Sequence, residues 1–120
     1  MRDLDAWELH FSPDVVIDLT RTVGVIIEGR AANRRFLEDW LVGYDELEYS
    51  TEGLVDLGNG VGFAVVVQSA RPTATTGFVR SRQGFVGFFD DGLITREFVY
   101  PRSEIDEARA AAERLAIERR

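Results

Sequence analysis

Two acidic residues lie in segments apolar enough to form the wall of a pocket. Asp18 stands near the end of the β-branched segment 15–19, and Glu97 lies within Leu93–Tyr100. Burial in an apolar pocket raises the pKa of a carboxyl group, which suits the removal of a proton next to a carbonyl. Asp18 is therefore a candidate general base, and the alternative is a solvated residue at a strand end.

Glu97 has its own pair of interpretations. It lies between Arg96 and Phe98 in the last apolar segment. A buried glutamate needs a partner, and Arg80 or Arg82 on the preceding segment is the expected one. The alternative is a cross-strand pair on the surface.

Tyr100 and His10 are weaker candidates. The hydroxyl of Tyr100 can donate to a ligand oxygen or to the backbone. His10 is the single histidine, and an unperturbed pKa near neutrality makes it either a pocket acid or base or an ordinary surface side chain.

Aromatic residues supply material for an apolar pocket that takes a ring-containing ligand. Trp40 and Tyr44 rank first, because they lie near a helix end where a cavity mouth is expected. The alternative for most of these rings is plain core packing. The remaining candidates for ligand contact are Trp7, Phe11, Phe36, Phe63 and Phe98.

The composition excludes several classes of site. The chain has no cysteine and one histidine, which excludes disulfide scaffolds, thiolate zinc sites and multi-histidine clusters. The segment Gly58-Asn59-Gly60 is typical of a hairpin turn and not of a phosphate-binding loop. A carboxylate-only Mg²⁺ or Ca²⁺ site is compatible with the composition, but no EF-hand spacing is present, and we expect no cofactor and no metal.

The charge argues against polyanionic partners. The chain carries 14 basic and 21 acidic residues, a net charge of −7, whereas nucleic acid and anionic membranes require a basic face. No apolar run approaches the roughly 18 residues of a spanning helix, and residues 1–5 are polar. We expect a cytoplasmic protein that binds neither nucleic acid nor membranes.

Periodicity predicts the elements that position these residues. Helical spacing indicates helices over 3–11 and 30–42, with Gly43 as a cap, and alternation indicates strands over 15–19 and 23–28. Four further strands are expected over 46–57, 61–70, 75–89 and 93–100, joined by short turns. A last helix begins near Ser103, with Asp106 completing a capping-box-like start.

The order helix, hairpin, helix, meander, helix favours one α+β domain over residues 1–120. Strands joined by short hairpins are antiparallel neighbours. We expect a cone-shaped curved antiparallel sheet of about six strands, wrapped around helices that lie on its concave side. The outer face is too large for the helices to cover, so we expect a homodimer through it.

Five short motifs resemble the SnoaL-like family of the nuclear transport factor 2-like superfamily, in family order. They are Pro13-Asp14-Val15, Asp18, Gly29-Arg30, Asp56-Leu57-Gly58 and Asp91-Gly92-Leu93-Ile94-Thr95-Arg96. The resemblance covers nearly the whole chain and implies the same curved-sheet fold. The superfamily holds cyclases, isomerases, hydrolases and binding modules, so the resemblance does not by itself give an activity.

The resemblance also bears on the acids. Ketosteroid isomerase-like members carry their general base close to the position of Asp18. The acid of SnoaL-like cyclases falls at Val99, which argues against that mechanism; if Val99 faces the pocket, Glu97 does too. Family members begin with a longer helical segment, so the cone is open at one end or the true start lies upstream of Met1.

Two functions follow. The first is a module that binds a small apolar or ring-containing molecule in the cone. The second is a cofactor-free isomerase, cyclase or hydrolase that uses Asp18 with Glu97 or Tyr100. A carboxyl group inside the cavity favours the enzyme, and two acids in solvent favour the binding module. A third alternative is a purely structural dimerisation domain, which a filled core with no cavity would indicate.

Overall fold

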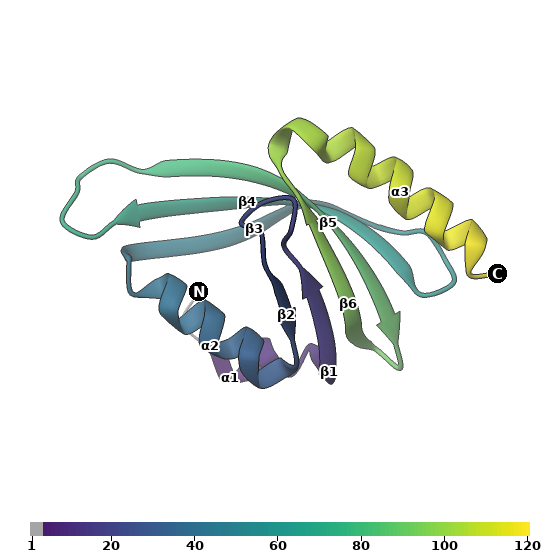
Figure 1. Cartoon of the computed structure of the whole chain (residues 1–120). Helices are drawn as coiled ribbons and strands as arrows, with labels where there is room; N and C mark the ends of the chain where they lie inside the picture. The colour runs from purple at the N-terminus through teal and green to yellow at the C-terminus, as the bar shows by residue number, and fades with distance from the viewer. Residues whose placement is uncertain (1–3) are drawn as a thin grey trace.

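The computed structural model describes residues 4–120 of the chain. It contains six strands and three α-helices, with a short 3-10 turn, Arg102–Glu104, before the last helix (Figure 1). In chain order they are α1 (Leu4–Glu8), β1 (Phe11–Asp18), β2 (Ile26–Glu28), α2 (Arg30–Leu41), β3 (Tyr44–Asp56), β4 (Val61–Pro72), β5 (Val79–Asp90), β6 (Leu93–Tyr100) and α3 (Ile105–Glu118).

All six strands form one curved sheet in the order β2-β1-β6-β5-β4-β3. Neighbours are antiparallel except β1 and β6, which run parallel. The α+β class and the curved six-stranded sheet are confirmed, and the sheet is open. The parallel pair joins distant parts of the chain, so no hairpin signal announces it.

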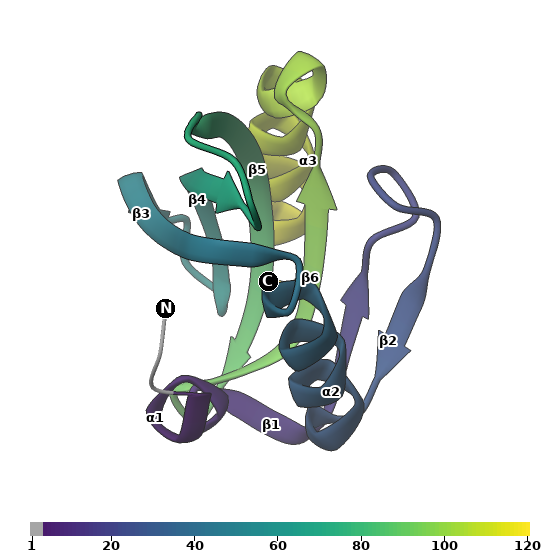
Figure 2. The same ribbon diagram turned by 90° about the vertical axis from the view of Figure 1, so that its left-hand side faces the viewer.

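The helices lie on opposite faces of this sheet. Figure 1 shows α1 and α2 inside the bend and α3 against the outer side, and Figure 2 shows α2 and α3 separated by the sheet. The prediction that all helices lie on the concave side is therefore wrong for α3. Its apolar stripe is made of small residues that allow close approach to the strands: Ala108, Ala111, Ala112 and Ala116 are all buried.

The outer core is built around that close approach. Val61, Phe63, Val86 and Tyr100 pack with the alanines of α3. At Gly84 an added Cβ would lie 2.9 Å from the Cβ of Ala108, so only glycine lets the helix sit at this distance. This side of the sheet is filled.

The inner core is smaller. Phe11, Val15, Ile17 and Ile27 are buried, and partly buried residues of α1 and α2 pack against them. Arg34 ties α2 to α1 through ion pairs with Asp5 and Glu8. The pair α1–α2 forms a wall opposite the strands.

Turn chemistry fixes the hairpins as predicted. Asn59 and both flanking glycines have positive φ between β3 and β4, and Asp91 and Gly92 do so between β5 and β6. Such conformations suit Gly, Asn and Asp. The span of β6 is confirmed to the residue.

Several local predictions about where the elements begin and end were wrong. The first helix ends at Glu8, and Phe11 instead opens β1, which carries a register shift before Val16. Residue 3, the predicted helix start, lies outside the described residues. The strand predicted over 23–28 is reduced to β2 because the preceding loop turns back on Leu19.

The predicted helix ends also differ. Gly43 is not a left-handed cap, because α2 ends through Val42 in helical conformation. Ser103 does not cap α3, whose N-cap is Glu104, because the 3-10 turn takes up Ser103.

Candidate functional site

A cavity of about 390 Å³ lies between the concave face of the sheet and the wall formed by α1 and α2. Every strand except β2 contributes to it, as do both helices and the loop between β1 and β2. The volume falls in the range of small-molecule sites. Its lining comprises Trp7, His10, Phe11, Ile17, Leu19, Thr22, Val23, Asn33, Phe36, Leu37, Trp40, Tyr49, Val66, Gln68, Gln83, Phe85, Ile94, Glu97 and Val99.

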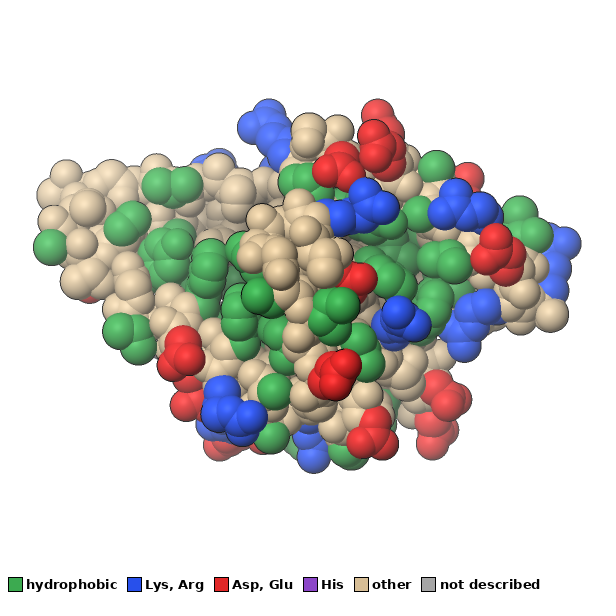
Figure 3. All heavy atoms as spheres, viewed as in Figure 1, with side chains coloured by type: hydrophobic (Ala, Val, Ile, Leu, Met, Phe, Trp, Pro, Cys, Tyr) green, Lys and Arg blue, Asp and Glu red, His purple; other side chains and the backbone are tan. Residues whose placement is uncertain are grey.

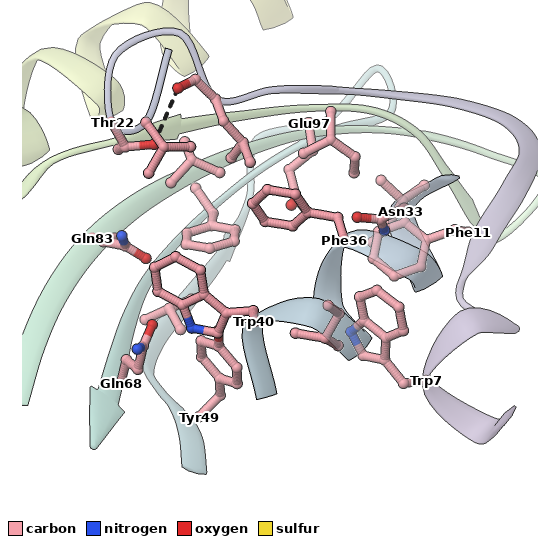
Figure 4. Close-up of a pocket in the computed structure, with 18 of the residues that line it drawn as sticks. Trp7, Phe11, Thr22, Asn33, Phe36, Trp40, Tyr49, Gln68, Gln83 and Glu97 are labelled. Carbon is pink, nitrogen blue, oxygen red and sulfur yellow. Dashed lines mark hydrogen bonds between the residues drawn. The ribbon is translucent and has the colours of Figure 1, made fainter. Parts of the chain in front are cut away.

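Aromatic rings form most of the helical wall. Trp7 and Phe11 pack with ring centroids 4.8 Å apart, and Phe36 and Trp40 lie nearly parallel at 6.2 Å. The spacing of Phe36, Leu37 and Trp40 places them on one face of α2, directed at the strands (Figure 4). The wall is therefore apolar and built from bulky side chains.

Glu97 is the acid inside this cavity. Its strand β6 lies between β1 and β5, where Glu97 is paired with Ile17 and Gly87. Its exposure is intermediate because the side chain opens onto the cavity. No hydrogen bond or ion pair from the described residues reaches its carboxyl, and burial raises the pKa of Glu97 to about 7.

The expected arginine partners face the other way. Arg80 donates to the Ser69 hydroxyl, and Arg82 forms an ion pair of 2.6 Å with Glu52. Both arginines alternate with Gln83 and Phe85, which line the cavity, so they lie on the outer face. The predicted Arg80 or Arg82 partner for a buried Glu97 was therefore wrong.

Two buried donors also lack partners among the described residues. They are Nδ2 of Asn33, whose side chain is 6% exposed, and Nε1 of Trp40. Figure 4 shows Asn33 beside Phe36 on the side of Glu97, while the Trp40 indole nitrogen lies toward Gln68 and Gln83. Unpaired buried polar groups are costly, so these donors are available for a ligand's acceptors.

Tyr49 and His10 complete the titratable groups of the lining. Burial raises the pKa of Tyr49 to about 12, so its hydroxyl remains protonated at neutral pH. His10 lies between α1 and β1, where its carbonyl accepts the N–H of Ile94.

Asp18 does not enter the cavity. Its neighbours Ile17 and Leu19 do, so alternation directs Asp18 to the opposite face. Its carboxylate accepts the hydroxyl and the N–H of Thr20 at 2.6 and 2.9 Å. These bonds hold the pKa of Asp18 below its ordinary value, so its predicted pocket role was wrong.

Four other candidates also lie outside the cavity lining. Tyr100 is buried on the α3 side, with the Arg21 guanidinium 4.5 Å above its ring. Phe63 belongs to the outer core, and Phe98 packs edge-on against Phe88. Tyr44 reaches the site only indirectly, through its contact with Trp40 at 5.9 Å.

The remaining predicted contacts, Trp7, Phe11, Phe36 and Trp40, line the cavity together with Glu97. The polar residues Asn33, Gln68 and Gln83 were not predicted. A signal for each was present: Asn33 lies one helical turn before Phe36 and Leu37, and Gln68 interrupts the apolar run of β4. Gln83 faces the cavity only through its pairing with Val66.

The arrangement can enclose an apolar molecule and meet it with one carboxyl group and several amide and indole donors. Among residues 4–120 no group of three or more histidine, cysteine or acidic side chains is placed to hold a metal ion. In the same part of the chain, no helix has the length and apolar character needed to cross a membrane.

Solved structures with this fold are similar at low sequence identity. A hypothetical protein with a ketosteroid isomerase-like fold from Catenulispora acidiphila, in complex with trimethylamine, has a TM-score of 0.73 at 10% identity over 83% of this chain and 75% of that chain. A Mycobacterium tuberculosis protein in complex with estradiol-17β-hemisuccinate has a TM-score of 0.68 at 20% identity, over 86% and 84%.

A third structure, a putative SnoaL-like polyketide cyclase from Jannaschia sp., has a TM-score of 0.66 at 13% identity over 92% of this chain and 78% of that chain. No curated protein sequence matches the chain. The family model described as "SnoaL-like domain" matches residues 1–97, from the N-terminus to Glu97 in β6. The chain therefore belongs to the SnoaL-like domain family.

Proposed function

We propose that the protein binds a small, largely apolar, ring-containing molecule in the cavity. The observation that carries this proposal is a 390 Å³ space walled by aromatic rings, into which unpartnered polar groups are directed. Rings supply buried apolar area, and the Trp40 indole N–H would donate to an acceptor on the ligand. Two similar structures that carry small molecules, estradiol-17β-hemisuccinate and trimethylamine, support the proposal.

Intrinsic fluorescence offers a direct test. The chain has two tryptophans, and both line the cavity. A panel of apolar ring compounds should change the emission and raise the melting temperature, because a ligand that binds only the folded state stabilises it.

Two variants of one residue separate shape from hydrogen bonding. Trp40→Phe keeps a ring and removes the donor, so affinity should fall about tenfold, whereas Trp40→Ala should abolish detectable binding. The matched control is Phe78→Ala at a residue 58% exposed and outside the lining, which should bind as the parent does. Absence of any binder in a broad panel would overturn the proposal.

A second candidate is a cofactor-free isomerase, cyclase or hydrolase. The favouring observation is that a carboxyl group with a pKa of about 7 lies in the cavity at Glu97, in place of the Asp18 first expected. Such a group suits proton abstraction near neutral pH. Exchange of the α-protons of a bound cyclic ketone for deuterium, lost in Glu97→Gln, would support it; no exchange above buffer would reject it.

Assembly and location stay proposals. Since α3 packs on the outer face against β4, β5 and β6, a homodimer would use the part of that face beyond the helix, on β3 and the adjoining ends of β4 and β5. Figure 3 shows few charged side chains on one side of this arm, and Val42, Phe78 and Val79 are exposed near its end. Its outer face carries the Arg82–Glu52 ion pair. Light scattering across a concentration series would test the dimer. The cytoplasmic location expected from the sequence stays a prediction.

A further inference from the structure

The cavity holds a negative group without a positive counterpart. The chain has no lysine, and among residues 4–120 no arginine lines the cavity that contains Glu97. Arg96, its neighbour in sequence, points to the other face and packs over the Phe98 ring at 5.0 Å. A carboxyl group out of water with no cation is unfavourable as an anion, so its partner is to be sought in the ligand.

Aromatic faces surround the same space. Six rings line it, from both helical and strand walls. The negative face of an aromatic ring attracts a cation, and cages of such rings are a known solution for binding alkylated ammonium groups. The six rings are those of Trp7, Phe11, Phe36, Trp40, Tyr49 and Phe85.

Resting on the proposed function, we propose that the natural occupant is an apolar amine in cationic form, with its ammonium group against Glu97 and its substituents against the rings. With a neutral ligand in the cavity, the carboxyl group of Glu97 would have to be either an unpaired buried anion or protonated and uncharged. A cation neutralises it and also gains from the ring faces. The unpartnered Trp40 nitrogen lies on the Gln68 and Gln83 side, so it does not oppose a cation at Glu97 (Figure 4).

Among residues 4–120, the groups that line the cavity around Glu97 include no arginine. Beside it on β1 and β5 the lining residues are apolar or amides, and α2 contributes Asn33 and three apolar side chains. The remaining titratable residues of the lining are Tyr49 on β3 and His10 before β1.

Two probes of the same shape test the proposal. Benzyltrimethylammonium carries a permanent positive charge, and neopentylbenzene has carbon in place of its nitrogen. Tryptophan fluorescence and calorimetry at pH 8.5 should show the cation binding about tenfold more tightly than the neutral probe. At pH 5.5 the cation should bind about tenfold more weakly than at pH 8.5, because Glu97 is then protonated.

The variant Glu97→Gln isolates the charge. It should remove the preference for the cation and keep binding of neopentylbenzene, which also shows that the pocket remains folded. Any pH dependence of cation binding left in this variant comes from groups other than Glu97. If the parent protein binds neopentylbenzene as tightly as the cation, or Glu97→Gln keeps the preference, the cation proposal fails while the binding function stands. If neither probe nor the wider ring-compound panel binds, both proposals fail.

Discussion

The two faces of the sheet are packed in opposite ways by the same strands. On the outer face α3 presents alanines, and the close approach at Gly84 leaves the core filled. On the concave face α2 presents Phe36, Leu37 and Trp40, and a 390 Å³ cavity remains. Small residues let a helix lie close to a sheet, whereas bulky ones hold it away and enclose space between them.

The two faces also differ in their contributions, because the outer face is built for stability and the concave face for binding. Val61 and Val86 on the outer face are 1% and 0% exposed, and the residues buried with them are apolar apart from the hydroxyl of Tyr100. The concave face carries the buried amide of Asn33 and the carboxyl of Glu97. We infer that the outer core supplies most of the stability of the fold, whereas the concave face is packed less tightly and so leaves space for a ligand.

The largest effect is expected at the closest contact of the outer face. In Gly84→Val the new Cβ would lie 2.9 Å from the Cβ of Ala108, which is too close for two carbon atoms. Helix α3 must therefore move away from the sheet. We expect a loss of about 3 kcal/mol or more in the free energy of unfolding, measured by urea denaturation. Hydrogen exchange should show α3 losing protection first, and an unchanged unfolding midpoint would contradict the close packing of this face.

Glu97 should make stability depend on pH in the opposite sense to most acids. Its folded pKa is raised from 4.5 to about 7, so the folded state holds a proton that the unfolded state releases between these values. Stability should therefore fall by up to about 3 kcal/mol as the pH rises from 4.5 to 7 and then level off. Glu97→Gln should remove this fall.

The measurement is urea unfolding of both proteins at half-unit steps from pH 5 to 8. At pH 8 the Gln variant should be the more stable. Parallel curves for the two proteins would show that Glu97 is solvated and would remove the contrast between the two faces.

One substitution made on each face probes the space directly. Val86→Ile adds a methylene to the filled outer core and should cost about 1–2 kcal/mol, whereas Val66→Ile extends into the cavity and should be nearly neutral. Both can be measured by thermal unfolding. The Val66 variant should also weaken binding of apolar ring compounds; equal costs for the two would argue that the concave face is packed as tightly as the outer one.

A smaller cost than at Val86 is expected at Asp18, on the solvent side of β1. Asp18→Ala removes two hydrogen bonds to Thr20 and should cost about 1 kcal/mol. Because the pKa of Asp18 is lowered, its contribution is fully present above the ordinary value of 3.8 and is lost as the pH falls below it, so the cost should shrink in acid. Ligand affinity should be unchanged in Asp18→Ala. A loss of binding would show that Asp18 belongs to the binding site after all.

Much of the local structure was predictable because it depends on near neighbours. The span of β6, the two glycine-containing turns and the apolar stripe of α2 all follow from residue type and period. The aromatic contacts on α1, β1 and α2 came from the same patterns. Gln83, in contrast, becomes a cavity residue only through its pairing with Val66 across two strands.

Taken alone, the sequence determined which residues of a strand share a face, since side chains alternate with a period of two. It did not determine which face is enclosed, because that depends on register with distant strands and on where the helices pack. The parallel pairing of β1 with β6 and the position of α2 put Ile17 and Glu97 inside and left Asp18 outside. Tertiary structure thus decided which of two similar acids lies in the site.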